Sequence, residues 1–152
     1  MDQIDARLLA LLQENGRITV SDLSKTLNLS RPSVTDRLRR LEEQHIVTGF
    51  TANVSPTGVG RDVLVIIEIS ELKVPCRRFE DYIADDTDIL ECHRVTGVMS
   101  YIMKAAVPSM VGLEALVDRL IIFGRVNTSI VLSSPVKFRP LLPPSVEQSE
   151  AT

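Results

Sequence analysis

The sequence predicts an α+β fold in which an N-terminal winged helix-turn-helix precedes a ferredoxin-like βαββαβ domain. Three observations lead to this prediction: three short stretches with helical spacing near the N-terminus, alternating strand and helix patterns later in the chain, and a turn-rich segment between them. A chain of 152 residues with 44% hydrophobic content can bury one medium core or two small ones. We therefore predict a first domain at residues 1–54, a linker at 55–61, the ferredoxin-like domain at 62–139 and a loose tail at 140–152.

Two helices are predicted before residue 30. Apolar residues at i, i+4, i+7 and i+8 from Ile4 predict the first helix, which Asp2 can cap and Asn15 can end. Thr19 can cap a short second helix, and Asn28 marks its end. The few residues that follow leave room only for a tight turn.

A third helix follows that turn. Ser30 can cap it, and Pro32 lies in its first turn, where a missing N–H costs little. Val34, Leu38 and Leu41 form its buried stripe. Three helices with this spacing are typical of a helix-turn-helix.

The next stretch predicts a wing and then a linker. Phe50, Ala52 and Val54 alternate with polar residues, which indicates a short, half-exposed hairpin. Turn-forming residues dominate positions 55–60, so we place the domain boundary there.

The second half alternates strand and helix patterns. The predicted elements are a buried strand at 63–69, a short helix from about Pro75, two strands at 89–96 and 101–107 joined around Gly97, a helix through Leu113, Leu116, Val117, Leu120 and Ile121, and a strand at 126–132. This order is the ferredoxin-like βαββαβ arrangement.

Charge is distributed unevenly along the chain. The formal net charge is −3, but residues 17–40 contain six cations and two anions, a local balance of +4. The rest of the chain therefore carries −7. A basic segment on an acidic body fits a DNA-binding unit attached to a second module, whereas the alternative is an ordinary solvated helix face.

The buried stripe of the third helix defines which residues can reach DNA. Successive side chains on a helix are about 100° apart, so the residues outside the buried stripe face away from the core and can enter a major groove. In such a groove, the N-terminal end of the helix lies nearest the base edges. Arg39 and Arg40 are expected to hold phosphates, and Arg37 to pair with an acidic residue of the first helix. The predicted DNA-binding residues are Ser30, Arg31, Ser33, Thr35, Asp36, Arg39 and Arg40.

Other classes of function find little support. The longest aliphatic run stops at Glu68, far short of the roughly 20 residues that cross a bilayer, and the N-terminus lacks the features of a secretory signal, so we expect a cytoplasmic protein. Cys92 and His93 are adjacent in a predicted strand and would point to opposite faces, which argues against a catalytic pair. No metal-ligand spacing or catalytic motif occurs, so we predict neither an enzyme nor a cofactor nor a metal site.

The order and spacing of several short motifs carry a family resemblance. They are Asp2-Gln3-Ile4-Asp5 with Leu8 and Leu9, Asn15-Gly16-Arg17, Leu29-Ser30-Arg31-Pro32-Ser33-Val34, Arg37-Leu38-Arg39-Arg40-Leu41-Glu42, Ile46, Val95-Thr96-Gly97 with Tyr101, and Thr128-Ser129-Ile130-Val131-Leu132. With these motifs the chain resembles the Lrp/AsnC, or feast/famine, transcriptional regulators of bacteria and archaea. The resemblance implies binding to double-stranded DNA, a homodimer formed by sheet contacts that often assembles into octamers, and in many members an amino acid bound between subunits.

The implied effector site departs from the family at two places. The usual glycine before the final strand is displaced, with Ile122-Phe123-Gly124 in that region, so we expect a different loop there. The expected effector-binding residues are Gly97, Val98, Met99, Ser100 and Thr128. The family commonly has Asp-Tyr-Asp after the glycine, so the acidic group that would meet a ligand ammonium is missing here. We therefore predict weak or absent amino-acid binding, unless Glu68, Glu91 or a carboxylate of a neighbouring subunit replaces it. The other alternative is an apolar effector in a pocket lined by Val98 and Met99. The alternative function is an architectural protein that bends or wraps DNA without an effector.

Overall fold

The computed structural model describes residues 1–144. Their contacts divide the chain into two compact units, one formed by Met1–Ala52 with the segment that begins at Val136, and the other by Asn53–Pro135. The first unit is therefore discontinuous in sequence. The expected loose tail at 140–152 falls partly outside the described residues, which end at Pro144.

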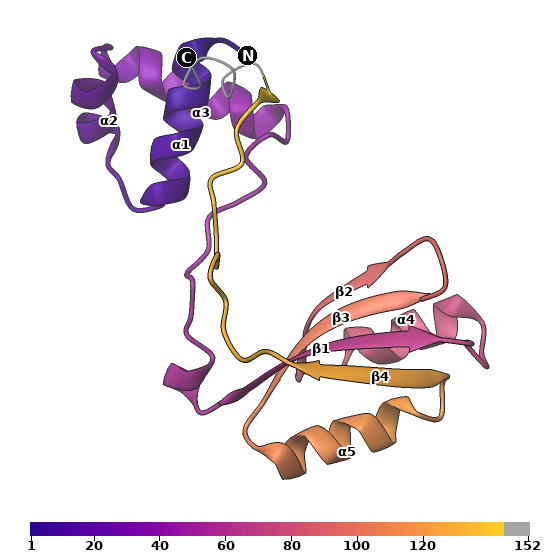
Figure 1. The fold of residues 1–152 in the computed structure, drawn as a ribbon. Helices are drawn as coiled ribbons and strands as arrows, with labels where there is room; N and C mark the ends of the chain where they lie inside the picture. Colours follow the sequence, from indigo (N-terminus) through magenta and orange to yellow (C-terminus); the bar gives the residue numbers. More distant parts are fainter. Residues whose placement is uncertain (145–152) are drawn as a thin grey trace. The chain divides into compact units, whose positions relative to one another are not determined.

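Three helices form the first unit: α1 (Gln3–Glu14), α2 (Val20–Leu27) and α3 (Arg31–Glu43) (Figure 1). Each begins where the sequence predicts, because the side chains of Asp2, Thr19 and Ser30 accept hydrogen bonds from backbone N–H groups of the first turn. Asn28 ends α2 in the left-handed conformation, with φ of 53°. The buried core of this unit consists of Leu8, Leu9, Leu23, Leu27, Val34 and Leu41.

The hairpin predicted after α3 does not form, so this prediction is wrong. Residues 48–55 are in no strand. The exposed fractions of Phe50 and Val54 are 54% and 59%, so their alternation with polar residues buries no face of a sheet. A hairpin needs a second strand to satisfy its backbone groups, and no strand pairs with this stretch within the described chain. A short 3₁₀ helix, η1 (Thr57–Val59), lies within the predicted linker.

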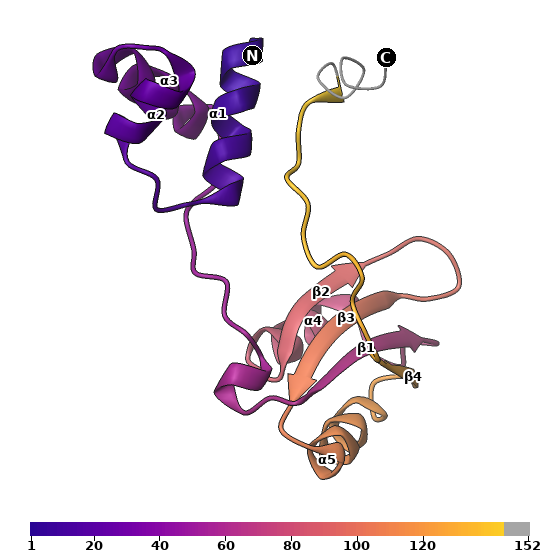
Figure 2. The same cartoon turned by 60° about the vertical axis from the view of Figure 1, so that its left-hand side comes forward.

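The second unit has the predicted βαββαβ order. Its elements are β1 (Val63–Ser70), α4 (Cys76–Ala84), β2 (Ile89–Arg94), β3 (Tyr101–Val107), α5 (Met110–Leu120) and β4 (Arg125–Ile130). The strands form one antiparallel sheet in the order β2-β3-β1-β4. Both helices cover the same face of this sheet, and the other face is open (Figure 2).

The core of the second unit lies between the sheet and its two helices. Alternate residues of β1 and β3, such as Ile67 and Met103, are fully buried in this core. Phe79 of α4 packs between two other aromatic rings, with centroid distances of 4.8 Å to Tyr101 and 5.5 Å to Phe123. The helices thereby hold the sheet rigidly from one side only.

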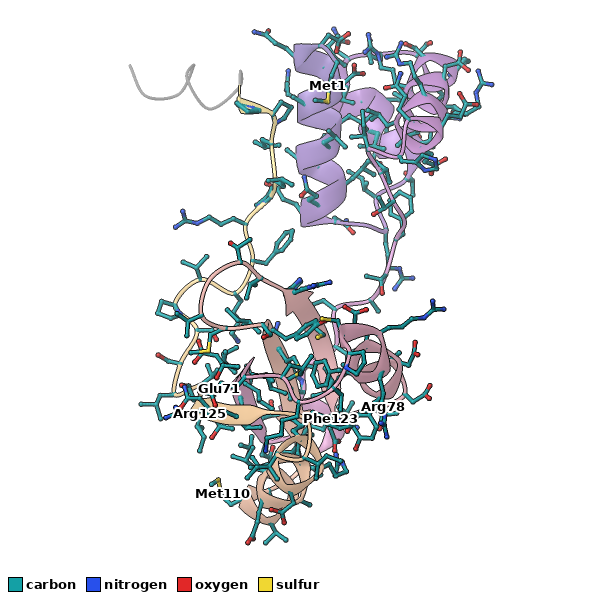
Figure 3. All side chains as sticks on the ribbon, turned by 90° about the vertical axis from the view of Figure 1, so that its right-hand side faces the viewer. Met1, Glu71, Arg78, Met110, Phe123 and Arg125 are labelled. Atoms are coloured by element: carbon teal, nitrogen blue, oxygen red, sulfur yellow. The ribbon has the colours of Figure 1, made fainter. Side chains whose placement is uncertain are left out.

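A close approach of two loops fixes the start of β4. A Cβ atom at Gly124 would lie 2.6 Å from the carbonyl oxygen of Ser70, so only glycine fits there. Next to it, an ion pair of 3.6 Å joins Arg125 Nη1 to Glu71 Oε1 (Figure 3). This packing sets where β4 meets the end of β1.

Candidate nucleic-acid interface and ligand loop

A cluster of ion pairs fixes α3 against the N-terminus of α1. Arg37 Nη1 lies 2.6 Å from Asp5 Oδ1 and 2.7 Å from Asp2 Oδ2, which confirms the predicted pairing of Arg37 with the first helix. The two carboxylates also form a reciprocal capping box, in which each side chain accepts a hydrogen bond from the backbone N–H of the other. One guanidinium thus joins the inner side of α3 to the first turn of α1.

The same cluster lowers the pKa values of both carboxyls. The pKa of Asp2 falls because the N–H of Asp5 and the guanidinium of Arg37 both bind its charged form. Burial by itself raises the pKa of Asp5, but the Asp2 N–H and Arg37 outweigh it and bring that pKa below its ordinary value. Both groups are therefore ionised at neutral pH.

The two arginines expected to hold phosphates lie in different surroundings. Arg39 is 68% exposed at its side chain, and its ion pairs within residues 1–144 are at i, i+3 and i, i+4, to Asp36 at 3.9 Å and Glu43 at 3.5 Å. Such exposed pairs contribute little to stability and are easily exchanged for a phosphate. Arg40, by contrast, lies 3.3 Å from Asp5 and is half exposed.

Of the remaining candidates, Ser30, Arg31, Thr35 and Asp36 are exposed and Ser33 is half-buried. Ser30 is the cap, with its hydroxyl 3.3 Å from the N–H of Ser33. Arg31 donates a 3.0 Å hydrogen bond to Ser21 of α2, so this guanidinium also ties the two helices together. Thr35 is exposed and donates to the carbonyl of Arg31 at 3.0 Å.

Sequence reasoning missed the importance of Asp5. Its side chain is only 4% exposed, and it contacts both Arg37 and Arg40. Two signals point to it: the i, i+3 spacing from the cap Asp2, and its position three and four residues before the buried Leu8 and Leu9. An acidic residue on the apolar face of a helix is expected to have a cationic partner.

The expected effector residues are not brought together within one chain. Gly97, Val98, Met99 and Ser100 lie in the loop between β2 and β3, whereas Thr128 lies on β4, which is separated from β3 by β1. Gly97 has a φ of 107°, and Val98 is 86% exposed. Within the described chain, the loop and Thr128 are therefore on opposite sides of β1.

The carboxylates suggested as substitutes already have partners. Glu91 accepts a 2.9 Å hydrogen bond from Lys104, and this contact, despite some burial, lowers the pKa of Glu91. Glu68 accepts a 2.8 Å hydrogen bond from Asn127. Each carboxylate uses one oxygen in its contact, so acceptor sites remain on both, but the charge of Glu91 is already partly compensated by Lys104.

Comparison with known families covers both units. The family description "Winged helix-turn-helix DNA-binding" matches residues 1–48, and "Lrp/AsnC ligand binding domain" matches residues 63–141, more than half of the chain. This chain belongs to the Lrp/AsnC family. The fold and the order of its units agree with that membership.

Similar proteins support the same conclusion. The uncharacterised HTH-type transcriptional regulator YezC of Bacillus subtilis is 36% identical over 134 residues, which cover 88% of this chain and 95% of YezC. The leucine-responsive regulatory protein of Escherichia coli is 36% identical over 113 residues, covering 72% of this chain and 69% of that protein. The chain is a DNA-binding transcriptional regulator of the Lrp type and not an enzyme.

Solved structures of other transcriptional regulators have the same fold. LrpC of Bacillus subtilis matches with a TM-score of 0.87 at 28% identity, covering 91% of this chain and 99% of LrpC. A transcriptional regulator of Neisseria meningitidis, solved with L-Met, matches with a TM-score of 0.88 at 27% identity, covering 96% of this chain and 99% of that one.

None of the helices within residues 1–144 has both the length and the apolar character needed to cross a membrane.

Proposed function

We propose that the protein is a dimeric, sequence-specific regulator that reads DNA with α3 and acts in the cytoplasm. The observation that carries this proposal is the division of α3 into two sides. Val34 and Leu41 are buried in the core and Arg37 is tied to α1, so a continuous arc of polar and cationic side chains remains free for a groove.

Within that arc we assign different roles to different residues. Arg31, Ser33, Thr35 and Asp36 near the N-terminus of α3 face base edges, with Ser30 at the phosphate backbone beside them. Hydrogen bonds to base edges carry sequence information, whereas contacts to phosphates fix position. Arg39 and Arg40 lie later on the helix and are assigned to phosphates.

A gel-shift experiment on the DNA upstream of the protein's own gene tests this proposal. We expect a shifted band that survives competitor DNA of mixed sequence, because base contacts make specific binding far tighter than phosphate contacts alone. Repeating the titration with each amino acid tests whether an effector changes the affinity. Equal competition by mixed-sequence DNA would contradict sequence-specific binding.

We propose the open face of the sheet as the contact between two copies. Leu64, Ile66 and Ile102 point away from the helices on this face and are only partly buried in the single chain. Pairing two such faces removes apolar surface from water. A dimer also matches two half-sites on DNA about one helical turn apart. Assembly into octamers is a further proposal that rests on the family.

For the effector site we propose that the loop between β2 and β3 meets a second copy. The Neisseria meningitidis regulator solved with L-Met supports an amino acid as the class of ligand. Backbone N–H groups around Gly97 can receive a carboxylate, but the loop here has no acidic residue for the ammonium group. Ordinary amino acids are therefore expected to bind weakly.

The missing acidic group also favours a second candidate function. A regulator without an effector could act by bending or wrapping DNA as an oligomer. A circular-permutation bending assay distinguishes an effector-dependent regulator from an architectural protein. If the protein bends DNA, the gel mobility of the complex depends on where the binding site lies in the fragment, and an architectural protein shows this without any amino acid.

A further inference from the structure

The C-terminal segment after β4 makes a two-point contact with α1. The backbone N–H of Leu141 donates to Gln13 Oε1 at 2.8 Å, and Gln13 Nε2 donates to the carbonyl of Leu141 at 3.1 Å. The side-chain amide therefore pairs with both polar groups of one backbone residue, as a neighbouring strand would. These two residues are 128 positions apart in the sequence.

Gln13 is held ready for this contact by α1 itself. Its Nε2 also donates to the carbonyl of Leu9 at 3.1 Å, one turn earlier in the helix. One amide thus uses both its N–H groups and its oxygen. Because the bond to Leu9 fixes the side chain, little rotamer freedom remains to be lost when the segment docks.

The docking segment is rich in proline. Residues 136–144 contain Pro140, Pro143 and Pro144, and proline fixes φ and favours an extended backbone. Leu142 and Pro143 are partly buried, whereas the side chain of Leu141 points away and is 84% exposed. The segment is therefore recognised through its backbone, with neighbouring apolar groups partly covered.

We propose that residues 136–144 are a docked arm of the DNA-binding unit, held on α1 by Gln13. The family match for the ligand-binding domain extends to residue 141, but the contacts of this chain group the segment with the helices. The ligand-binding unit is then joined to the DNA-binding unit by two connections, one after Ala52 and one before Val136. The second connection follows β4, the strand that carries Thr128.

Limited digestion of the full chain with trypsin tests the arm. Trypsin can cut after Lys137, whereas Pro140 protects the bond after Arg139. Lys137 is exposed, but a protease must bind several residues on either side of the bond it cuts, so a segment held at Leu141 should be cut more slowly than a released one. We expect Gln13→Ala to raise the rate of cleavage after Lys137 about fivefold, since two neutral hydrogen bonds are lost. Gln13→Glu keeps the acceptor for the Leu141 N–H and should give an intermediate rate.

The controls separate docking from general loosening. Glu14→Ala changes the exposed neighbour of Gln13 and should leave the rate of cleavage after Lys137 unchanged. A chain truncated after Pro144 keeps Leu141 and should also be cut at the parent rate. Equal rates for the parent and Gln13→Ala, with unchanged helical circular dichroism, would overturn the proposal. Protection that disappears on dilution would also overturn it, because the bound arm would then belong to another copy.

Discussion

Arg37 Nη1 lies between the carboxylates of Asp2 and Asp5, at 2.7 Å and 2.6 Å, and so fixes α3 to the first turn of α1. The arrangement places a nearly buried carboxylate opposite a cation that is only 20% exposed. Removing one member of such a pair leaves the other charged and poorly solvated. The stability of the helical unit therefore depends on the cluster remaining complete.

We expect Arg37→Met to lower the free energy of unfolding by about 2 kcal/mol, because Asp5 loses its main cationic partner. Urea denaturation followed by circular dichroism measures the effect. The double variant Asp5→Asn with Arg37→Met removes the unpaired charge and should recover part of the loss. A double variant less stable than the sum of its single changes would contradict the assigned coupling.

The contribution of this cluster should depend on pH. The pKa values of Asp2 and Asp5 are lowered in the folded chain from an ordinary value of 3.8, so the folded state binds these protons less readily than the unfolded state. Their contribution is present above about pH 4 and is lost as the pH falls through the lowered values. The stability difference between the parent and Arg37→Met should therefore shrink on acidification. A difference that stays constant from pH 7 down to pH 3 in urea titrations would contradict the ionic origin.

Local sequence predicted the helical caps but not the contacts between distant residues. Thr19 and Ser30 could be assigned because a cap depends only on residues three positions apart. The hairpin through Phe50 failed because a strand needs a partner that alternation alone does not identify.

In the candidate site, too, local features were predictable from the sequence and contacts between distant residues were not. The exposed side of α3 followed from helical periodicity, whereas the contact of Arg40 with Asp5 joins residues 35 positions apart. Likewise, helix and strand patterns located Gly97 and Thr128, but the sheet order that separates them comes from long-range pairing. Contacts of this kind depend on how the elements pack.

Replacing Arg39 and Arg40 with alanine should weaken DNA binding and reduce its dependence on salt. Each lost phosphate contact lowers the slope of log K against log salt by about 0.9. The matched control replaces Arg77 and Arg78, which are exposed on α4 in the other unit. Fluorescence anisotropy at several salt concentrations gives both slopes. An unchanged slope in a folded Arg39/Arg40 variant would mean that these residues do not hold phosphates.

The dimer contact can be tested at Ile66. This side chain is on the open face of the sheet, opposite Lys104 in the β1–β3 register. Ile66→Asp would place a charge in the proposed interface without disturbing the helix-covered core, so we expect monomers at micromolar concentration. Val111→Asp on α5 changes an exposed apolar residue elsewhere and should leave the mass unchanged in light scattering. Dimers of unchanged stability in the Ile66 variant would exclude the open face as the contact.

Amino-acid binding should be weak, and restoring an acidic group to the ligand loop should strengthen it. The ammonium group of a zwitterion meets only neutral groups in Val98, Met99 and Ser100, and charge-assisted hydrogen bonds are roughly twice as strong as neutral ones. We therefore expect Val98→Asp, a change at a side chain that is 86% exposed, to tighten binding about tenfold for at least one amino acid. Calorimetric titration of parent and variant with the twenty amino acids makes the comparison, with Val98→Asn as the uncharged control. A low-micromolar dissociation constant for the parent would show that another carboxylate already fulfils this role, and Glu68 and Glu91 would then be the first residues to replace.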